Sequence, residues 1–297
     1  MSLRDFGLMA VVCLLWASNN IVSKYVVSHL GLPPLFYATV RFAIVALATL
    51  PWLLPMPRPR LRLIAVATLM GGCNFALIFI GLKTSTPSAV AVVSQLGVPI
   101  TTLLSVVMLG EKIHWRRGLG IALTFAGALA VMWNPGGFSI STGLLYVVAS
   151  ACAGSLGAVM MKQIEGVKPL QFQAWVGFAS VWPLLILTAL FEPGQVQAGI
   201  DAGWPFVAAV VYSGLVVSVG AHTAYYLLIG RYEANLISPL TLMTPLATIA
   251  LGVAIFHDPF GPRMAIGSAI ALTGVLIIAL RRNQVMPLLL AIRNRAQ

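Results

Sequence analysis

Ten apolar stretches, each about as long as a membrane span, alternate with short polar turns along the chain of 297 residues. A helix that crosses the roughly 30 Å hydrocarbon core of a bilayer needs about 20 apolar residues. The pattern predicts spans near 6–28, 34–55, 63–83, 86–108, 115–133, 142–162, 170–191, 203–228, 235–256 and 261–281. It therefore indicates an all-α membrane protein with ten transmembrane helices.

The second five stretches repeat the first five. Residues 33–47 read PPLFYATVRFAIVAL and residues 169–183 read PLQFQAWVGFASVWP, with seven identities in the first thirteen aligned positions. Because each half has an odd number of spans, the second copy must enter the membrane from the opposite face, which is the inverted-repeat plan of many secondary transporters. We place the first five-helix repeat at 1–136, the second at 137–283 and a cytoplasmic tail at 284–297.

The composition excludes a soluble fold. Hydrophobic residues make up 59% of the chain and charged residues 8%, against roughly 25% charged residues in a soluble domain. The longest turns are predicted at 55–62 and in the acidic stretch 191–203, so no soluble domain fits between the spans.

The net charge of +11 is a topology signal and does not indicate nucleic-acid binding, because the lysines and arginines gather on alternate turns. With a cytoplasmic N-terminus, fourteen of them lie at inner ends of spans, and only Lys24, Lys83 and Arg263 lie at outer ends. This positive-inside bias predicts that both termini are cytoplasmic. Membrane lipid is the expected surrounding, with no nucleic-acid partner.

All the carboxylates lie at span ends or in turns. They are Asp5, Glu111, Glu165, Glu192, Asp201, Glu233 and Asp258. Proton-driven export of cationic drugs rests on a carboxylate inside the membrane, where an unpaired acid is costly and therefore functional. The sequence offers no residue for that mechanism.

One face of the first span is polar. Trp16, Asn20 and Lys24 recur every four residues, with Asn19 beside them on the helix. The asparagines could bind the ammonium and carboxylate of a zwitterion, and Trp16 could stack on an apolar or aromatic group. A hydrogen-bonded patch between helices is the structural alternative.

Arg41 lies about two turns into the second span, and no acid is available to it within the membrane. We expect it to face an aqueous cavity, pair with helix-end carbonyls, snorkel outward or meet an anionic group of a substrate.

Other spans carry further candidates. His222 is the only histidine well inside a span, so a proton-linked step would run through it, whereas a neutral hydrogen-bonding role is the alternative. Pro99 and Pro245 are predicted to kink the fourth and ninth spans in mid-helix, and Pro239 adds a break, which makes these prolines candidates for gating. The remaining candidates for substrate binding are Tyr37, Asn74, Phe75, Phe79, Gln95, Trp175, Tyr225 and Tyr226.

No enzymatic motif accompanies these residues. The sequence lacks HExxH, a P-loop and a Gly-rich nucleotide fingerprint. Its cysteines lie in mid-span without metal-ligand spacing. We predict no enzyme activity, no metal and no cofactor.

Four segments carry a family resemblance. They read LLWASNNIVSK at 14–24, TVRFAIVAL at 39–47, GLGIALTFAGALAV at 118–131 and GRYEANLISPLTLMTPLATIALGVAIFHD at 230–258. On these segments the chain resembles the drug/metabolite transporter (DMT) superfamily, specifically its EamA-type exporters, which include the YddG-like amino-acid exporters. The turn Phe256-His257-Asp258 departs from the family pattern.

The resemblance implies two inverted five-helix repeats around a central cavity in a bacterial inner membrane, with export of amino acids or related metabolites by alternating access. By position, Trp16, Asn20, Arg41 and Pro245 match the family pattern. The family does not share one substrate, but a lining of Asn, Gln, Tyr and Trp without acids favours neutral or carboxylate-bearing solutes, such as aromatic amino acids.

Alternative functions stay open at this point. A multidrug or nucleoside/sugar exporter would use the same fold, and an intramembrane enzyme or a receptor is a more distant alternative. The sequence does not decide between a monomer and a homodimer.

Overall fold

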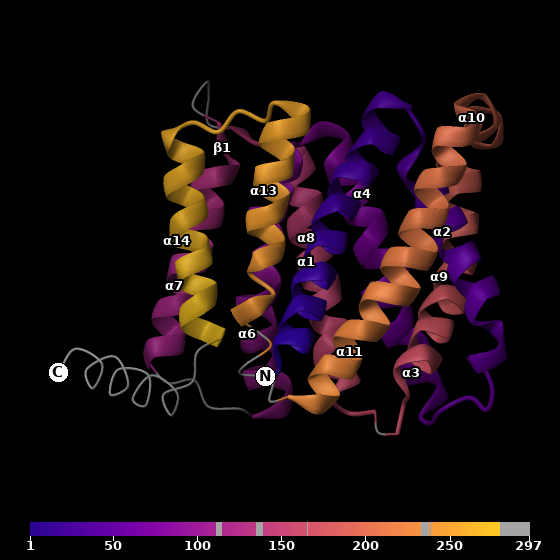
Figure 1. Ribbon diagram of the computed structural model, residues 1–297, viewed down its shortest axis with the longest axis horizontal. Coiled ribbons are helices and arrows are strands. Elements are labelled where there is room, and N and C mark those ends of the chain that lie inside the picture. The colour runs from indigo at the N-terminus through magenta and orange to yellow at the C-terminus, as the bar shows by residue number, and fades with distance from the viewer. Residues whose placement is uncertain (111–114, 135–138, 165, 233–236, 238, 280–297) are drawn as a thin grey trace.

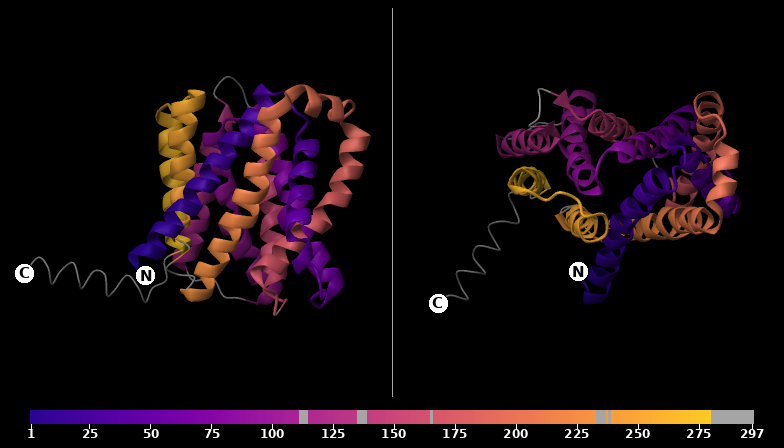
Figure 2. Two further views of the ribbon diagram at one scale, coloured as in Figure 1. Left: turned by 45° about the vertical axis from the view of Figure 1, so that its right-hand side comes forward. Right: turned by 90° about the horizontal axis from the view of Figure 1, so that it is seen from above.

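The computed structural model describes residues 1–110, 115–134, 139–164, 166–232, 237 and 239–279. Most of these residues are helical, apart from turns and one short antiparallel pairing of β1 (Trp133–Asn134) with β2 (Ser139–Ile140). The helices stand side by side as one bundle (Figures 1 and 2). The prediction of an all-α fold is confirmed for the described residues.

Several predicted spans consist of more than one helical element. In the first part of the chain the elements are α1 (Leu3–Lys24), η1 (Tyr25–His29), α2 (Pro34–Thr49), η2 (Leu50–Trp52), α3 (Arg60–Thr68), η3 (Leu69–Cys73), α4 (Asn74–Thr84), α5 (Pro87–Val93), η4 (Ser94–Leu96), α6 (Gly97–Leu109) and α7 (Trp115–Met132). In the second part they are α8 (Thr142–Met161), α9 (Pro169–Phe191), α10 (Gln195–Val211), η5 (Tyr212–Ala221), α11 (His222–Arg231), α13 (Met243–Phe256) and α14 (Pro262–Ala279). The elements η1, η3 and η5 are π-helical, and η2 and η4 are 3₁₀-helical.

Eight continuous helical stretches among the described residues are long and apolar enough to cross a membrane. They are Leu3–His29, Pro34–Trp52, Arg60–Thr84, Pro87–Leu109, Thr142–Met161, Pro169–Phe191, Gln195–Leu228 and Pro262–Ala279. The predicted ninth span corresponds to the shorter apolar helix α13, and the fifth to α7, which begins with a tryptophan and two arginines. The protein is thus a multi-pass membrane protein with eight such stretches.

Proline begins several of the long helices. Pro34, Pro87, Pro169 and Pro262 each lie at the start of a helix, in α2, α5, α9 and α14. Proline suits the first helical turn, because the N–H that it lacks would have no partner within the helix.

Two carboxylates bind the N-terminal ends of helices from the other half of the chain. Glu192, after α9, accepts hydrogen bonds of 2.9 and 2.8 Å from the backbone N–H groups of Leu35 and Phe36 in α2. Asp258, after α13, accepts from the backbone N–H and the hydroxyl of Ser88 in α5. Negative charge is stabilising at a helix N-terminus, so these acids have a structural role at the ends of spans.

Sequence-related helices pack directly against each other. The duplicated segments lie in α2 and α9, which are neighbours in the bundle (Figure 1). A Cβ atom added to Gly177 in α9 would lie 2.7 Å from the backbone nitrogen of Ala46 in α2. Such close approach of backbones is typical of membrane helices with small residues at their interface.

The predicted acidic turn at 191–203 is wrong in part. Its second half is helical, because α10 begins at Gln195 and merges two helices across a bend at Gly203. Gly203 has φ 57° and ψ −141°, a conformation that glycine adopts without the steric cost of a Cβ atom. The helix of the eighth predicted span therefore begins eight residues before the predicted start at 203 and is bent at Gly203.

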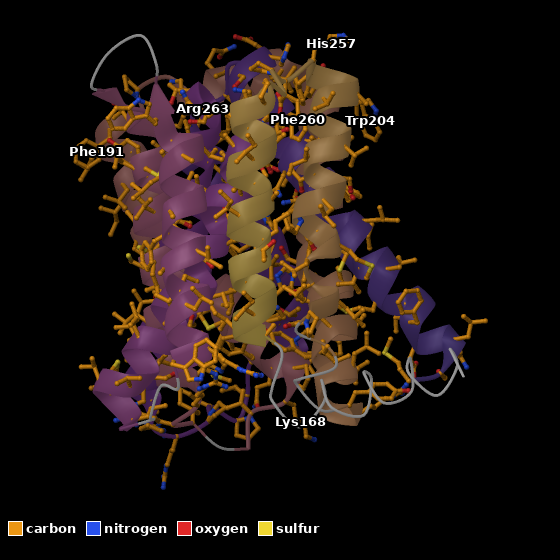
Figure 3. All side chains as sticks on the ribbon, turned by 90° about the vertical axis from the view of Figure 1, so that its left-hand side faces the viewer. Lys168, Phe191, Trp204, His257, Phe260 and Arg263 are labelled. Carbon is orange, nitrogen blue, oxygen red and sulfur yellow. The ribbon has the colours of Figure 1, made fainter. Side chains whose placement is uncertain are left out.

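The two ends of the bundle carry different residues (Figure 3). Lys168 lies at the end near the N-terminus, whereas Phe191, Trp204, His257, Phe260 and Arg263 lie at the opposite end (Figures 1 and 3). Between the ends, many large apolar side chains are exposed on the outside of the bundle. In a multi-pass protein these side chains face lipid.

Candidate functional site

Two polar candidates follow π-helical stretches. The stretch η5 ends directly before His222, and η3 ends directly before Asn74. A π-helix is wider than an α-helix because its hydrogen bonds join residues five positions apart, and such distortions often occur at functional sites. The third and eighth predicted spans therefore both deviate from regular helix immediately before a polar side chain.

Trp16 lies at the centre of an aromatic cluster between α1 and α11. Its ring centroid lies 5.2 Å from that of His222 and 4.9 Å from that of Tyr225, which in turn lies 5.8 Å from Tyr226. His222 Nδ1 lies 3.0 Å from the carbonyl oxygen of Val217. The Nε1 donor of Trp16 is buried and has no hydrogen-bond partner in the described protein. The structure thus brings four of the predicted residues together.

The two neighbouring asparagines of α1 have different surroundings. Asn20 donates a 3.3 Å hydrogen bond from Nδ2 to the hydroxyl of Thr248 in α13, so it joins two helices. Asn19 is buried, and its Oδ1 acceptor has no partner. The contact between helices that the sequence offered as an alternative therefore accounts for Asn20 but not for Asn19.

Arg41 is completely buried, with 0% of its side chain exposed. Its Nε and Nη2 atoms both donate to the hydroxyl of Ser218, at 3.1 and 2.9 Å. The guanidinium carbon lies 4.2 Å from the ring centroid of Phe75, 5.7 Å from that of Phe79 and 5.9 Å from that of Phe42. The Nη1 atom has no partner. The sequence allowed several arrangements for Arg41. Because its side chain is completely buried, snorkelling to the membrane surface is excluded.

Tyr37 supports Arg41 from one turn away on α2. Its hydroxyl lies 2.7 Å from that of Ser213 and 3.3 Å from that of Ser23, and its ring packs 4.6 Å from Phe79. The Ser218 hydroxyl donates to the carbonyl oxygen of Ser213 at 2.9 Å. A buried chain of hydroxyl groups therefore connects α1, α2 and η5 and orients the group that binds Arg41.

A small cavity of about 70 Å³ lies beside this chain. Its lining residues are Phe42, Met70, Phe75, Phe172, Gln173, Val176, Ser218, His222 and Tyr226. Phe75, His222 and Tyr226 were predicted as lining residues, whereas Gln173 and Phe172 of α9 were missed. The signal for Gln173 was available in the sequence, because it is a polar residue in an otherwise apolar segment.

A larger cavity of about 200 Å³ lies between α4, α6 and α8. Its lining residues are Asn74, Ile78, Ser94, Gly97, Thr101, Ser150, Ala151, Gly154 and Ser155. Asn74 donates from Nδ2 to the carbonyl oxygen and the hydroxyl of Ser150, at 2.9 and 3.0 Å. The lining is rich in hydroxyl groups and contains no ionised side chain, which suits a neutral or zwitterionic solute.

Nine of the thirteen predicted substrate-binding residues line neither cavity: Trp16, Asn19, Asn20, Tyr37, Arg41, Phe79, Gln95, Trp175 and Tyr225. Trp175 donates from Nε1 to the carbonyl oxygen of Leu53 at 3.0 Å, so it binds the turn after α2. Gln95 lies in η4, next to the cavity residue Ser94, but does not itself line that cavity.

Two of the prolines predicted to kink helices in mid-span lie in the first turn of a helical element. Pro99 lies in the first turn of α6, directly after the 3₁₀ turn η4, and Pro245 lies in the first turn of α13. Pro239 lies just before the turn at 241–242 that precedes α13. Pro99 therefore follows a 3₁₀ turn inside the continuous stretch Pro87–Leu109, whereas Pro245 lies near the start of a helix, where proline fits better than in a helix interior.

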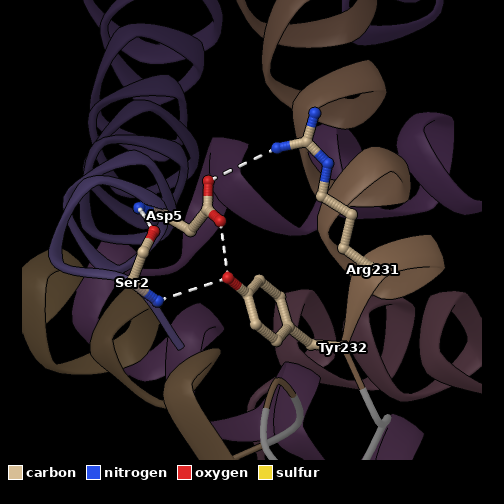
Figure 4. Close-up of polar contacts among 4 residues, drawn as sticks. All are labelled: Ser2, Asp5, Arg231 and Tyr232. Carbon is tan, nitrogen blue, oxygen red and sulfur yellow. Dashed lines mark hydrogen bonds and ion pairs between the residues drawn. The ribbon is translucent and has the colours of Figure 1, made fainter.

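A polar contact closes the N-terminal end of the bundle (Figure 4). Tyr232, after α11, donates from its hydroxyl to Asp5 of α1 at 2.6 Å and accepts from the backbone N–H of Ser2 at 3.2 Å. Arg231 adds an ion pair of 3.5 Å with Asp5. This contact joins α1 to the end of α11.

Metal-ligating side chains do not cluster in the described part of the chain. No group of three or more His, Cys, Asp or Glu side chains could hold a metal ion there. Glu111, Glu165 and Glu233 lie outside the described residues. The interior offers neutral hydrogen-bonding groups, aromatic rings and the cation of Arg41, which can bind and release a small solute without a chemical step.

Comparisons with known proteins agree with this geometry. The sequence pattern of the EamA-like transporter family matches residues 6–133 and 141–280. A solved crystal structure has the same fold over 93% of this chain and 96% of its own, with a TM-score of 0.62 and 20% sequence identity.

Several relatives have names that describe transport. A probable amino-acid metabolite efflux pump of Salmonella typhimurium is 23% identical over 93% of this chain and 95% of its own length, and one of Escherichia coli is 22% identical with the same coverage. A probable terminal-alkyne amino-acid exporter of Streptantibioticus cattleyicolor is 25% identical over 89% of both chains. The predicted resemblance is thus confirmed, and the chain belongs to the EamA-like transporter family.

Proposed function

We propose that the protein is a secondary transporter that exports amino acids with aromatic or neutral side chains, or related metabolites, by alternating access through a central cavity. The relatives named as amino-acid metabolite efflux pumps and as an amino-acid exporter support this substrate class. The family and these names indicate transport, and no enzymatic role is proposed.

The observation that carries the proposal is a set of unpaired polar atoms in the interior. Trp16 Nε1, Asn19 Oδ1 and Arg41 Nη1 are buried without a hydrogen-bond partner in the described protein. Each unpaired buried polar group costs roughly 1–3 kcal/mol, and more when it is charged. All three atoms belong to residues that the sequence indicated for substrate binding. A polar solute would supply the partners that helix packing does not.

The proposed topology has ten spans with both termini in the cytoplasm of a bacterium and the spans in its inner membrane. The five-helix repeats would occupy 1–136 and 137–283, followed by a cytoplasmic tail at 284–297. The direct packing of α2 on α9, two sequence-related helices, supports an inverted repeat. Lys168, at the end of the bundle near the N-terminus, agrees with the positive-inside rule, whereas Arg263 at the opposite end is one of the three cations predicted at outer ends (Figure 3).

Resistance to toxic analogues tests the export of amino acids in cells. Bacteria that express the protein should tolerate analogues of aromatic or neutral amino acids and should release the natural amino acid into the medium. The matched control is the Trp16→Ala variant at equal membrane abundance, which should lose both effects. Resistance to cationic drugs or nucleosides without release of amino acids would contradict the proposal.

A further inference from the structure

Arg41 is a fully buried cation for which the described residues provide no carboxylate. The described carboxylates bind elsewhere: Asp5 to Tyr232, Glu192 to the first turn of α2, Asp201 to Gln197 and Asp258 to Ser88. A buried charge without an opposite charge is costly, and inside a membrane such a residue marks a functional site.

Neutral groups satisfy only part of the guanidinium. Two of its nitrogen atoms donate to a single hydroxyl, that of Ser218, and the Phe75 ring covers one side at 4.2 Å. Arginine has five N–H donors in a planar fork, and Nη1 has no acceptor in the described protein. The fork therefore has one nitrogen whose hydrogen bonds the packing of the helices does not satisfy.

The small cavity lies next to this arginine. Ser218 and Phe75, which hold Arg41, both line it, together with Gln173 from α9 and His222 from α11. Its volume of about 70 Å³ exceeds what one water molecule needs. Among the polar side chains of the lining, the amide of Gln173 and the hydroxyl of Tyr226 can donate hydrogen bonds, and none of the lining residues is an acid. Such a lining complements an anionic group.

We propose that Arg41 and Gln173 form a subsite for the carboxylate of the transported solute. The protein then selects its cargo by a free carboxylate and not by an ammonium group. A carboxylate can accept two parallel hydrogen bonds from a guanidinium, which an ammonium group cannot do. This inference rests on the proposed export function and names the part of the substrate that the site requires.

Four related compounds test the carboxylate and the ammonium group of an amino acid independently. Purified protein in proteoliposomes is assayed with labelled L-phenylalanine, L-phenylalaninamide, 3-phenylpropanoate and 2-phenylethylamine. L-Phenylalanine and 3-phenylpropanoate should be transported. The amide and the amine should be transported at least about tenfold more slowly, which is the size of effect expected for one charge-assisted hydrogen bond.

Variants of neighbouring glutamines locate the subsite. Gln173→Leu should reduce the preference for 3-phenylpropanoate over 2-phenylethylamine. Gln171→Leu on the same helix is the matched control, because Gln171 donates a hydrogen bond to the carbonyl oxygen of Pro55 outside the cavity. This variant should keep the wild-type preference for 3-phenylpropanoate over 2-phenylethylamine. Arg41→Lys keeps the charge but loses the planar fork, so it should weaken the preference as well. If Arg41→Lys fails to fold, the glutamine pair still decides.

The possible results distinguish this inference from the function on which it rests. Transport of L-phenylalanine together with equally fast transport of its amide and of 2-phenylethylamine would overturn the carboxylate subsite and leave amino-acid export intact. An unchanged preference in Gln173→Leu would overturn it too. No transport of any of the four compounds would overturn the export function and the inference with it.

Discussion

Gly127 of α7 and Gly267 of α14 touch so closely that a Cβ atom added to Gly127 would lie 2.5 Å from the carbonyl oxygen of Gly267. A Cβ atom on Gly120 would likewise lie 2.7 Å from the carbonyl oxygen of Gly274. The two helices are therefore antiparallel and in contact along two glycine pairs. Both helices belong to one chain, so these glycines pack within it.

Replacing Gly127 by alanine should therefore force α7 and α14 apart. Overpacking of this kind costs roughly 1–3 kcal/mol, so we expect a lower melting temperature of the purified protein. Gly118→Ala is the matched control on the same helix, because a Cβ atom there has nothing within 4 Å. Equal melting temperatures for the two variants would refute the close contact.

Asp258 is expected to stabilise the end of the bundle opposite the N-terminus. It is buried and accepts hydrogen bonds from the backbone and hydroxyl of Ser88. Asp258→Ala leaves these donors unpaired and should destabilise the protein by roughly 1–3 kcal/mol. Asp201→Ala removes only an exposed contact with Gln197 and should have little effect. The measurement is thermal unfolding in detergent, and a loss of the same size in both variants would contradict the assigned role.

The contact of Tyr232 with Asp5 should hold the N-terminal end closed (Figure 4). Tyr232→Phe removes the hydroxyl and keeps the ring, so the first turn of α1 should exchange its amide hydrogens faster with deuterium. Tyr146→Phe, at an exposed position of α8, serves as the control. Unchanged exchange in the Tyr232 variant would mean that the contact does not hold this end.

Export should proceed down the concentration gradient of the solute without proton coupling. The described carboxylates all lie at the ends of helices, and His222 is the one histidine in the middle of a described span. We expect that a pH gradient imposed on proteoliposomes drives no accumulation of labelled amino acid. Accumulation that disappears in His222→Gln would instead establish proton-linked transport through that residue.

The hydropathy pattern was sufficient to predict the helical fold, because a membrane helix needs a continuous run of apolar residues of a definite length, and such a run is visible in the sequence. It did not predict the helix after Gln195, since its polar residues Gln197 and Asp201 gave the segment the composition of a turn. The bend at Gly203 that separates it from the membrane span depends on one backbone conformation. Such a conformation is not visible in the hydropathy of the neighbouring residues.

Some of the candidates that the sequence indicated on separate helices lie together in the structure. Trp16 of α1 contacts His222 and Tyr225 of α11. The sequence indicated Trp175 but not Gln173 as a candidate, although the two lie two residues apart on α9. Which of them faces the cavity depends on how α9 rotates against its neighbours, and hydropathy does not report that rotation. Trp175 binds the turn after α2, and Gln173 lines the cavity.

Efflux of labelled L-phenylalanine from preloaded proteoliposomes tests most directly whether the polar interior conducts amino acids. The wild-type protein should release the label faster than protein-free liposomes, and Trp16→Ala should reduce that rate by about tenfold or more, as expected when a buried aromatic contact of about 1.4 kcal/mol or more is lost. Trp182→Ala, at an exposed position of α9, should retain the wild-type rate. Equal rates for the wild type, Trp16→Ala and empty liposomes would contradict the account.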